Sequence, residues 1–254
     1  MNCIVVDIGN TRASVGLLRG GRVIRTVQVL KAVADPAVID RRIRSLIAGT
    51  PIDGSVLCSV VPRLNRLWTG CLARAAGAKP IVVSHKIDLG VGIDYPKPAT
   101  IGADRLANAS GAVARYAPPV IVADFGTALT FDIVSAEGRY VGGVIAPGMP
   151  LMLDYLAERT ALLPRIRIPG PCASVGRSTA GAMRIGARIG YRGMVREITE
   201  YLLDGLGTRD VRLAATGGYA PWALDGLDMG YVLDADLTLY GLGRIFELNC
   251  GARD

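Results

Sequence analysis

Hydrophobic positions recur along the chain at two different spacings, and each change of spacing marks the edge of a predicted element. Apolar residues three and four apart, as at Leu106, Ala109 and Val113, predict amphipathic helices. The Asp35-Pro36 pair, an N-cap followed by a favoured first helical residue, starts the first of them. The predicted helices cover residues 35–48, 62–77, 104–116, 149–162, 178–203 and 237–248.

Short β-rich apolar runs fill the intervals between the helices. They predict strands at residues 56–59, 81–83, 120–123, 141–145 and 211–215. Strands that alternate with helices, together with hairpins, indicate an α/β fold with mixed sheets.

The chain contains one internal similarity, between residues 5–15 and 122–132. Each segment has an apolar run, an Asp, a Gly two residues later, a small polar residue and a second β-like run, and hairpin turns follow at 19–22 and 135–138. The repeat predicts two similar lobes: 1–117, with a first phosphate loop, and 118–254, with a second phosphate loop and an adenosine turn. A cleft between two such lobes is a natural ligand site.

Charge and composition narrow the class of protein. The chain has 29 Lys and Arg against 22 Asp and Glu, a net charge of +7, but the arginines are scattered and favour no nucleic-acid groove. The N-terminus reaches an acid before a signal-peptide core could form, and no apolar run is long enough to span a bilayer. Five cysteines without a C-x-x-C pair argue against a disulfide framework or a zinc site. These features predict a soluble, cytoplasmic protein.

Two Asp–Gly turns carry the first candidate chemistry. In the first, Asp7 at the end of a buried strand can hold Mg²⁺ or its water shell, and Gly9 allows the backbone to approach a phosphate closely. An ordinary hairpin turn has the same composition. The second copy, Asp124-Phe125-Gly126-Thr127, favours the functional interpretation, because two such turns facing each other suit a triphosphate with its cations.

A third motif, Gly102-Ala103-Asp104-Arg105, begins a predicted helix. An acid in the first helical turn is also a good capping residue, so a purely structural role stays open. Asp104 beside Arg105 can pair a proton acceptor with an anion clamp.

Three further segments are rich in small residues. Residues 142–148 suit a close-packed loop that leads into a helix. Gly186 and Gly190, four residues apart, predict close helix packing within or between subunits, and the strand that ends in Thr216-Gly217-Gly218 can accept a flat base or a ribose.

In order and spacing, these motifs resemble those of type III pantothenate kinases, members of the acetate and sugar kinase, Hsp70 and actin superfamily. The resemblance covers the whole chain, through residues 7–11, 59–62, 95–105, 124–130, 142–148, 178–190, 216–218 and 237–242. It implies duplicated ribonuclease-H-like (actin-like) lobes, each a mixed β-sheet flanked by helices, with an interlobe cleft. It also implies ATP-dependent phosphorylation of pantothenate to 4′-phosphopantothenate, the first step of coenzyme A biosynthesis.

The resemblance assigns roles to individual residues. ATP-binding roles fall on Asp7, Ile8, Gly9, Asn10, Thr11, Arg12, Ala13, Ser14 and Thr127. Pantothenate-binding roles fall on Tyr95, Gly102, Ala103, Asp104, Arg105 and Thr179, with Asp104 as the catalytic proton acceptor and Thr179 reaching the pocket from the partner subunit of a homodimer. Asp124 holds a monovalent cation, K⁺ or NH₄⁺, and Mg²⁺ accompanies ATP. The chain has no G-x-x-x-x-G-K-[ST] motif, so cations and backbone amides must neutralise the triphosphate.

The sequence departs from the family pattern at two places. Lys97 stands where relatives often carry a polar amide, and Phe125 replaces the small residue more usual in the second phosphate turn. Two alternatives stay open: a non-catalytic regulatory paralogue with the same fold, and a related kinase that acts on another small hydroxylated acid. The single histidine, His85, has no assigned role.

Overall fold

The structure is a computed structural model that describes residues 1–30, 35–167, 170 and 173–250. Cys172 lies outside the described residues, whereas Cys3, Cys58 and Cys71 are buried free thiols. The chain forms two compact units. The first unit comprises Met1–Val120, Ile133–Gly142 and Asp236–Asp254, and the second comprises Ile121–Asp132 and Gly143–Ala235.

The first sheet lies wholly in the first unit and begins with the predicted double hairpin. Its strands are β1 (Asn2–Ile8), β2 (Arg12–Arg19), β3 (Arg22–Leu30), β4 (Gly54–Ser59) and β5 (Ile81–Val82). They are arranged in the order β3-β2-β1-β4-β5, with β1 antiparallel to β2 and parallel to β4. The hairpin turn predicted at residues 19–22 is confirmed, because β2 ends at Arg19 and β3 begins at Arg22.

The second sheet repeats this order. Its strands are β6 (Gly92–Ile93), β7 (Val120–Phe125), β8 (Ala128–Val134), β9 (Arg139–Pro147), β10 (Arg212–Thr216) and β11 (Val232–Leu233). The order is β11-β10-β7-β8-β9-β6. Starting at β9, the neighbouring strands are β9, β8, β7, β10 and β11. In chain order these are the third, second, first, fourth and fifth strands of this copy, which is the order β3-β2-β1-β4-β5 of the first sheet. The internal similarity of the sequence is therefore a duplication of topology, with β6 added as an edge strand.

Helices occupy the predicted intervals. They are α1 (Pro36–Ile47), α2 (Pro62–Ala76), the short 3₁₀ helix η1 (Pro98–Thr100), α3 (Ala103–Arg115), α4 (Met149–Arg159), α5 (Thr179–Ile185), the π-helical η2 (Gly186–Gly190), α6 (Tyr191–Leu206), α7 (Ala220–Leu224) and α8 (Leu237–Cys250). Asp35 caps α1 as predicted, its Oδ1 accepting a hydrogen bond from Ala37 N at 2.9 Å. Strands β6 and β11 and helix α7 are too short to show a hydrophobic period, and the sequence pattern missed them.

The single helix predicted over residues 178–203 is wrong in one respect. The structure divides this segment into α5, the π-helical η2 and α6. Gly186 opens η2 and Gly190 closes it, and glycine is the residue that holds the α conformation least well apart from proline. A Cβ built on either glycine would have no described atom within 4 Å, so the close helix packing predicted there is not found among the described residues of one chain, and packing between subunits stays a prediction.

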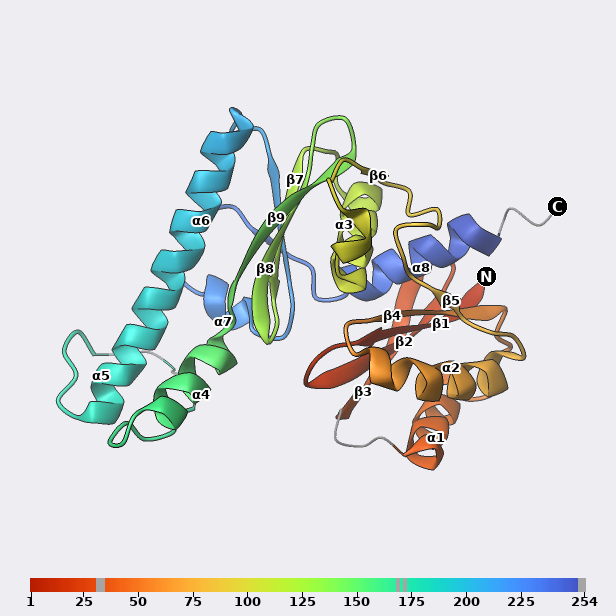
Figure 1. The fold of residues 1–254 in the computed structure, drawn as a ribbon, viewed down its shortest axis with the longest axis horizontal. Helices are drawn as coiled ribbons and strands as arrows, with labels where there is room; N and C mark the ends of the chain where they lie inside the picture. Colours follow the sequence, from red (N-terminus) through yellow and green to blue (C-terminus); the bar gives the residue numbers. More distant parts are fainter. Residues whose placement is uncertain (31–34, 168–169, 171–172, 251–254) are drawn as a thin grey trace. The chain divides into compact units, whose positions relative to one another are not determined.

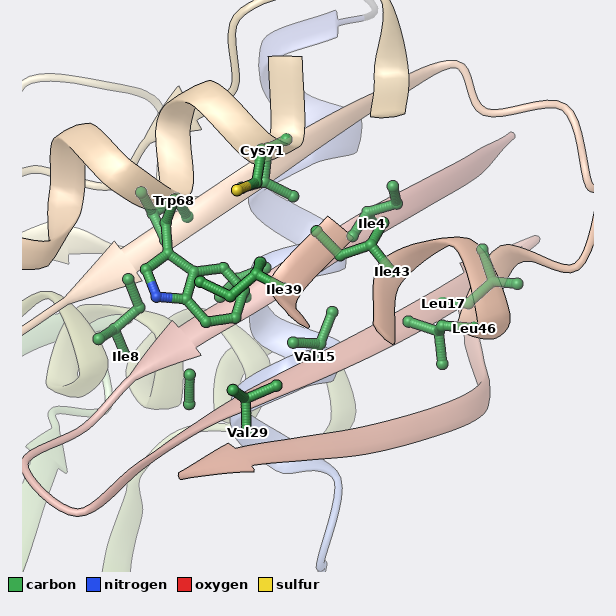
Figure 2. Close-up of a cluster of buried hydrophobic side chains, with 14 of the residues drawn as sticks. Ile4, Ile8, Val15, Leu17, Val29, Ile39, Ile43, Leu46, Trp68 and Cys71 are labelled. Atoms are coloured by element: carbon green, nitrogen blue, oxygen red, sulfur yellow. The ribbon is translucent and has the colours of Figure 1, made fainter. Parts of the chain in front are cut away.

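Two layers of helices cover the first sheet within the first unit. On one face, side chains of β1–β3 pack against α1 and α2, and Figure 2 shows Trp68 and Cys71 of α2 beside Ile39 and Ile43 of α1. On the other face, the alternate residues Cys3 and Val5 pack against α3 and α8. Because successive side chains of a strand point to opposite faces, β1 supplies both cores.

The last helix of the chain belongs to the first unit. Helix α8 packs along α3, and Thr238 Oγ1 donates a hydrogen bond to Oδ1 of the buried Asn108 at 2.7 Å. Figure 1 shows α3 and α8 side by side within this unit. The division into lobes at 1–117 and 118–254 stays a prediction, and the compact units are divided differently, since the C-terminal helix joins the N-terminal part.

Every helix in the described part of the chain is too short or too polar to cross a membrane.

Candidate active site

The first predicted phosphate turn is a tight connection between β1 and β2. Gly9 N donates to Arg12 O at 3.0 Å, and the two strands pair in register from Ile8 with Ala13 outward. Asn10 and Thr11, at the tip of the turn, are exposed. The turn therefore presents polar side chains and backbone amides at the end of a buried strand, the arrangement that a phosphate requires.

Asp7 lies on the face of the first sheet that α3 covers. Strand alternation sends Ile4, Val6 and Ile8 to the α1–α2 side, so Asp7 shares the opposite face with Cys3 and Val5. Its Oδ1 accepts a hydrogen bond from the Cys58 thiol of β4 at 3.2 Å. Cys58 is fully buried, and burial, followed by the charges of Asp7 and Asp104, raises the pKa of this thiol well above its ordinary value.

Asp104 lies in the first turn of α3, on the same side of this sheet. Its Oδ1 accepts a hydrogen bond from the backbone N–H of Arg105 at 2.8 Å. Burial raises the pKa of Asp104 above its ordinary value of 3.8, while the Arg105 N–H and the Arg105 charge act in the opposite direction. Helix α3 packs against β4, the strand that carries Cys58, and the charge of Asp104 contributes to the raised pKa of this thiol.

The side chains of Arg105 and Tyr95 both contact the ring of Tyr140. The guanidinium carbon of Arg105 lies 5.7 Å from the centroid of the Tyr140 ring. The rings of Tyr95 and Tyr140 have centroids 6.2 Å apart and planes at 63°, an edge-to-face contact. Four predicted pantothenate residues, Tyr95, Gly102, Asp104 and Arg105, therefore belong to one part of the first unit, and Ala103 begins the helix between them.

The second phosphate turn lies in the second unit, between β7 and β8. Gly126 N donates to Ala128 O, two residues on, at 3.0 Å, whereas Gly9 N in the first turn donates to Arg12 O, three residues on. Two glycines from other motifs close on it. A Cβ on Gly148 would lie 2.1 Å from Thr127 O, and a Cβ on Gly217, whose φ is +91°, would lie 2.5 Å from Asp124 Oδ1. Residues 142–147 belong to strand β9, so the loop predicted over 142–148 is wrong. Gly148, directly after β9, and Gly217, directly after β10, both lie against the second phosphate turn.

Phe125 is fully buried behind this turn. Its ring lies 6.4 Å from that of Tyr191 in α6, and Tyr191 lies 5.8 Å from Trp222 in α7. The large side chain at this departure from the family pattern therefore fills an aromatic core. Asp124, Gly126 and Thr127 keep their places in the turn, and Tyr219 N donates to Phe125 O at 3.1 Å.

Thr179, Lys97 and His85 are the other residues that the sequence analysis singled out. Thr179 is exposed at the start of α5 in the second unit, where Ser178 caps the helix by accepting a hydrogen bond from Gly181 N. Lys97 is exposed and precedes η1. His85 lies in the segment between β5 and β6 and makes no contact that assigns it a role. The assignment of Thr179 to pantothenate stays a prediction.

Among the described residues, no three His, Cys, Asp or Glu side chains gather into a group that could hold a metal ion. Mg²⁺ bound with nucleotide phosphates takes several of its ligands from substrate and water. At the second turn, the carbonyl oxygens of Gly126 and Thr127 face Gly148, and Oδ1 of Asp124 faces Gly217.

Comparison with known proteins shows which family the chain belongs to. The family model described as type III pantothenate kinase matches residues 3–201. A type III pantothenate kinase of Akkermansia muciniphila is 45% identical over 212 residues, which cover 84% of this chain and 86% of that protein. The chain belongs to the type III pantothenate kinase family. Family membership makes it a kinase that uses ATP and phosphorylates pantothenate in coenzyme A biosynthesis.

Solved structures support the fold. A Baf family transcriptional activator from Campylobacter jejuni has a TM-score of 0.64 at 17% identity, and the match covers 98% of this chain and 99% of that one. A ROK family glucokinase from Streptomyces griseus, solved with glucose and AMPPNP, has a TM-score of 0.54 at 16% identity and coverage of 99% and 100%. The predicted actin-like fold is confirmed.

Three residues that the structure places beside the predicted site residues were missed in the sequence: Cys58, Tyr140 and Tyr191. Cys58 precedes the Ser59–Pro62 motif on β4, and the strand period alone would have placed it on the Asp7 face. Tyr140 and Tyr191 belong to elements far along the chain from the residues they contact, so no local pattern could have indicated them.

Proposed function

We propose that this protein transfers the γ-phosphoryl group of ATP to the 4′-hydroxyl of pantothenate, with Asp104 accepting the hydroxyl proton. The observation that carries the proposal is the packing of α3, which bears Asp104 in its first turn, against the face of the first sheet that bears Asp7. The carboxylate of the first phosphate turn and the proposed proton acceptor thus lie on the same face of one sheet. Phosphoryl transfer requires the phosphates and the attacking hydroxyl to be held close together and in line.

Asp104 has the properties of a proton acceptor. Its burial raises the pKa of the carboxyl group toward working pH, which strengthens it as a base, while Arg105 keeps it ionised. The hydrogen bond from Arg105 N fixes one carboxylate oxygen. The other oxygen orients the 4′-hydroxyl and accepts its proton as the bond to phosphorus forms.

Arg105 binds the carboxylate of pantothenate in this proposal. A guanidinium group binds a carboxylate through two parallel hydrogen bonds, which gives orientation as well as affinity. Tyr95 contacts Tyr140 as Arg105 does, and we call the surface formed by the Tyr95 and Arg105 side chains the Tyr95–Arg105 wall. Gly102 leaves space there, since a Cβ at this position would lie 2.5 Å from Asp104 Oδ1.

The two Asp–Gly turns bind the triphosphate. Asn10 and Thr11 are exposed at the first turn and present hydrogen-bond donors, and Thr127 presents its side chain from the second turn. None of the described lysines lies in a phosphate turn, because Lys79, Lys86 and Lys97 are exposed elsewhere in the first unit. Mg²⁺ carried by ATP then supplies the charge neutralisation that a lysine provides in P-loop enzymes.

Asp124 is the proposed ligand of a monovalent cation, K⁺ or NH₄⁺. Its carboxylate lies beside the second turn, where a Cβ on Gly126 would be 3.7 Å from Asp124 Oδ1. Carboxylate and backbone carbonyl oxygens are the donors that potassium takes in proteins, so the residues present fit such an ion. We expect Asp124→Asn to raise the K⁺ concentration needed for half-maximal rate by about tenfold, the equivalent of about 1.4 kcal/mol.

We also propose a homodimer in which Thr179 of one subunit reaches the pantothenate pocket of the other. Support comes from the exposed apolar side chains of the helices around it, such as Tyr155 at 63%, Ile189 at 60% and Tyr201 at 73% exposure. The use of ATP supports a cytoplasmic location.

A coupled ADP-release assay tests the function. With MgATP and K⁺, we expect ADP release that depends on pantothenate and is absent with other small hydroxylated acids. Turnover with another acid and none with pantothenate would favour the related-kinase alternative. No turnover in K⁺ or NH₄⁺, together with salt-sensitive DNA binding, would favour the regulatory paralogue.

A further inference from the structure

Tyr140 of β9 is fully buried and has no role in the chemistry described above. Its ring nevertheless contacts two residues of the proposed pantothenate site from separate parts of the chain. The Arg105 guanidinium carbon lies 5.7 Å from the ring centroid, and the Tyr95 ring meets it edge to face with centroids 6.2 Å apart. One buried aromatic ring therefore supports both side chains.

The backbone around Tyr140 also contacts the segment that carries Tyr95. Ile93 pairs with Tyr140 in the parallel β6–β9 ladder, and Asp94 N donates to Tyr140 O at 2.9 Å, one residue before Tyr95. Two residues further along β9, on the face that carries the Tyr140 side chain, Gly142 has a φ of +132°. A Cβ there would lie 3.5 Å from the Tyr95 ring. The Tyr95 ring thus rests on Tyr140 and on the bare backbone of Gly142.

An unsupported arginine side chain samples many rotamers and loses them when it binds an anion. A ring face below the guanidinium attracts the positive charge and restricts those rotamers before the ligand arrives. Buried rings have few alternative positions in a close-packed core, so Tyr140 is itself fixed.

We propose that Tyr140 is a positioning residue for substrate recognition: its ring holds Arg105 and Tyr95 in the arrangement that receives the carboxylate end of pantothenate. This inference rests on the proposed function of Arg105 and Tyr95. It assigns to Tyr140 an effect on pantothenate binding and none on ATP binding.

The test compares variants of the full chain by steady-state kinetics with each substrate varied in turn. Tyr140→Phe keeps the ring and is expected to stay within about twofold of wild type. Tyr140→Leu removes the π face, and we expect it to raise the KM for pantothenate about tenfold, within the range of a partly buried cation–π contact. The KM for ATP should change less than about twofold, as should kcat.

A matched control separates positioning from loss of core volume. Phe246 of α8 is 2% exposed and its ring lies against Gly54 at the start of β4, so Phe246→Leu removes a buried ring from another place in the same unit. Its melting temperature should fall without a change in the KM for pantothenate. If Tyr140→Leu does not fold, Tyr140→Met keeps more of the buried volume without a π face and takes its place.

Two results would overturn the inference. The first is a KM for pantothenate within twofold of wild type in Tyr140→Leu. The second is a rise in the KM values for both substrates that follows the loss of stability of the variants. A second measurement, pantothenate binding by calorimetry, keeps the inference distinct from the proposed function. Weakened binding in Tyr140→Leu supports the positioning role even if wild type shows no turnover. Absence of pantothenate binding to wild type overturns both.

Discussion

The two phosphate turns occupy equivalent places in two sheets with the same strand order, yet their surroundings differ. At the first turn, Asp7 accepts a hydrogen bond from a buried thiol, and a Cβ on Gly9 would approach Arg12 O no closer than 3.3 Å. At the second turn, Gly148 and Gly217 press against the backbone and the Asp124 carboxylate, where a Cβ would lie 2.1 and 2.5 Å away. The first turn is open, and the second is enclosed by other loops.

This difference shows how a duplicated unit acquires two roles. An open turn can present side chains to a substrate and tolerate changes of shape on binding. An enclosed turn has little freedom, and its oxygen atoms are held in fixed positions, which suits an ion site. Asp104, the proposed base, lies with the first turn, so chemistry and ion binding are assigned to different copies of one motif.

Asp104→Asn should have the largest effect on activity, because it removes the base on the side of the open turn. We expect kcat to fall about 10²–10⁴-fold, the usual contribution of a positioned base, with nucleotide affinity nearly unchanged. The pKa of Asp104 is higher in the folded state than the ordinary value of 3.8, so the folded protein holds this proton more tightly than the unfolded chain does. The free energy of unfolding therefore falls as the pH rises above 3.8 and the carboxyl group ionises. The variant should therefore melt no lower than wild type at pH 7. A rate near wild type would remove Asp104 as the base.

Alanine substitutions at Gly148, which lies against the second turn, and at Gly9, within the first turn, compare how tightly the two turns are packed. Gly148→Ala should lower the free energy of unfolding by about 3 kcal/mol, because its Cβ would overlap a backbone carbonyl that cannot move away easily. Gly9→Ala, at the open turn, should cost less than about 1 kcal/mol. Urea unfolding of both variants measures the difference. Equal losses would show that the two turns are enclosed alike.

Arg105→Gln should move the acidic limb of the pH profile to higher pH. The base acts when deprotonated, and the Arg105 charge lowers the pKa of Asp104, so removing that charge raises this pKa. The backbone hydrogen bond from residue 105 remains. We expect the acidic limb of the kcat profile, measured at saturating pantothenate, to lie at higher pH than in wild type. A shift to lower pH would contradict this assignment.

Cys58→Ala should have the smallest effect, since a thiol is a weak hydrogen-bond donor. Loss of the bond to Asp7 should raise the KM for ATP about threefold, and Cys58→Ser, which keeps a donor, should restore it. Equal KM values in both variants would show that the thiol only fills space.

Much of the fold could be predicted because its elements are local and periodic. The helix that starts at Pro36, the hairpin at Arg19–Arg22 and the two Asp–Gly turns each carry their own signal in a few neighbouring residues. The duplication was also readable, since both copies keep the same order of residue types. The break at Gly186 was not predicted, because one glycine in a helical pattern is usually tolerated.

The site could be predicted only as separate motifs. That Gly148 and Gly217 close on the second turn depends on loops far apart in the chain, and no local period relates them. The same holds for Tyr140 beneath Arg105. A strand shows which face a side chain occupies, but its neighbour across the layer depends on tertiary packing.

The central claim is that the two turns and Asp104 together phosphorylate the 4′-hydroxyl of pantothenate. Phosphorus NMR of the reaction of the full chain with pantothenate, MgATP and K⁺ tests it most directly. The account predicts a new phosphomonoester signal coupled to the 4′ methylene protons, growing in step with ADP and absent without pantothenate. Inorganic phosphate as the only product, or a phosphorylated carboxylate in place of the ester, would contradict it.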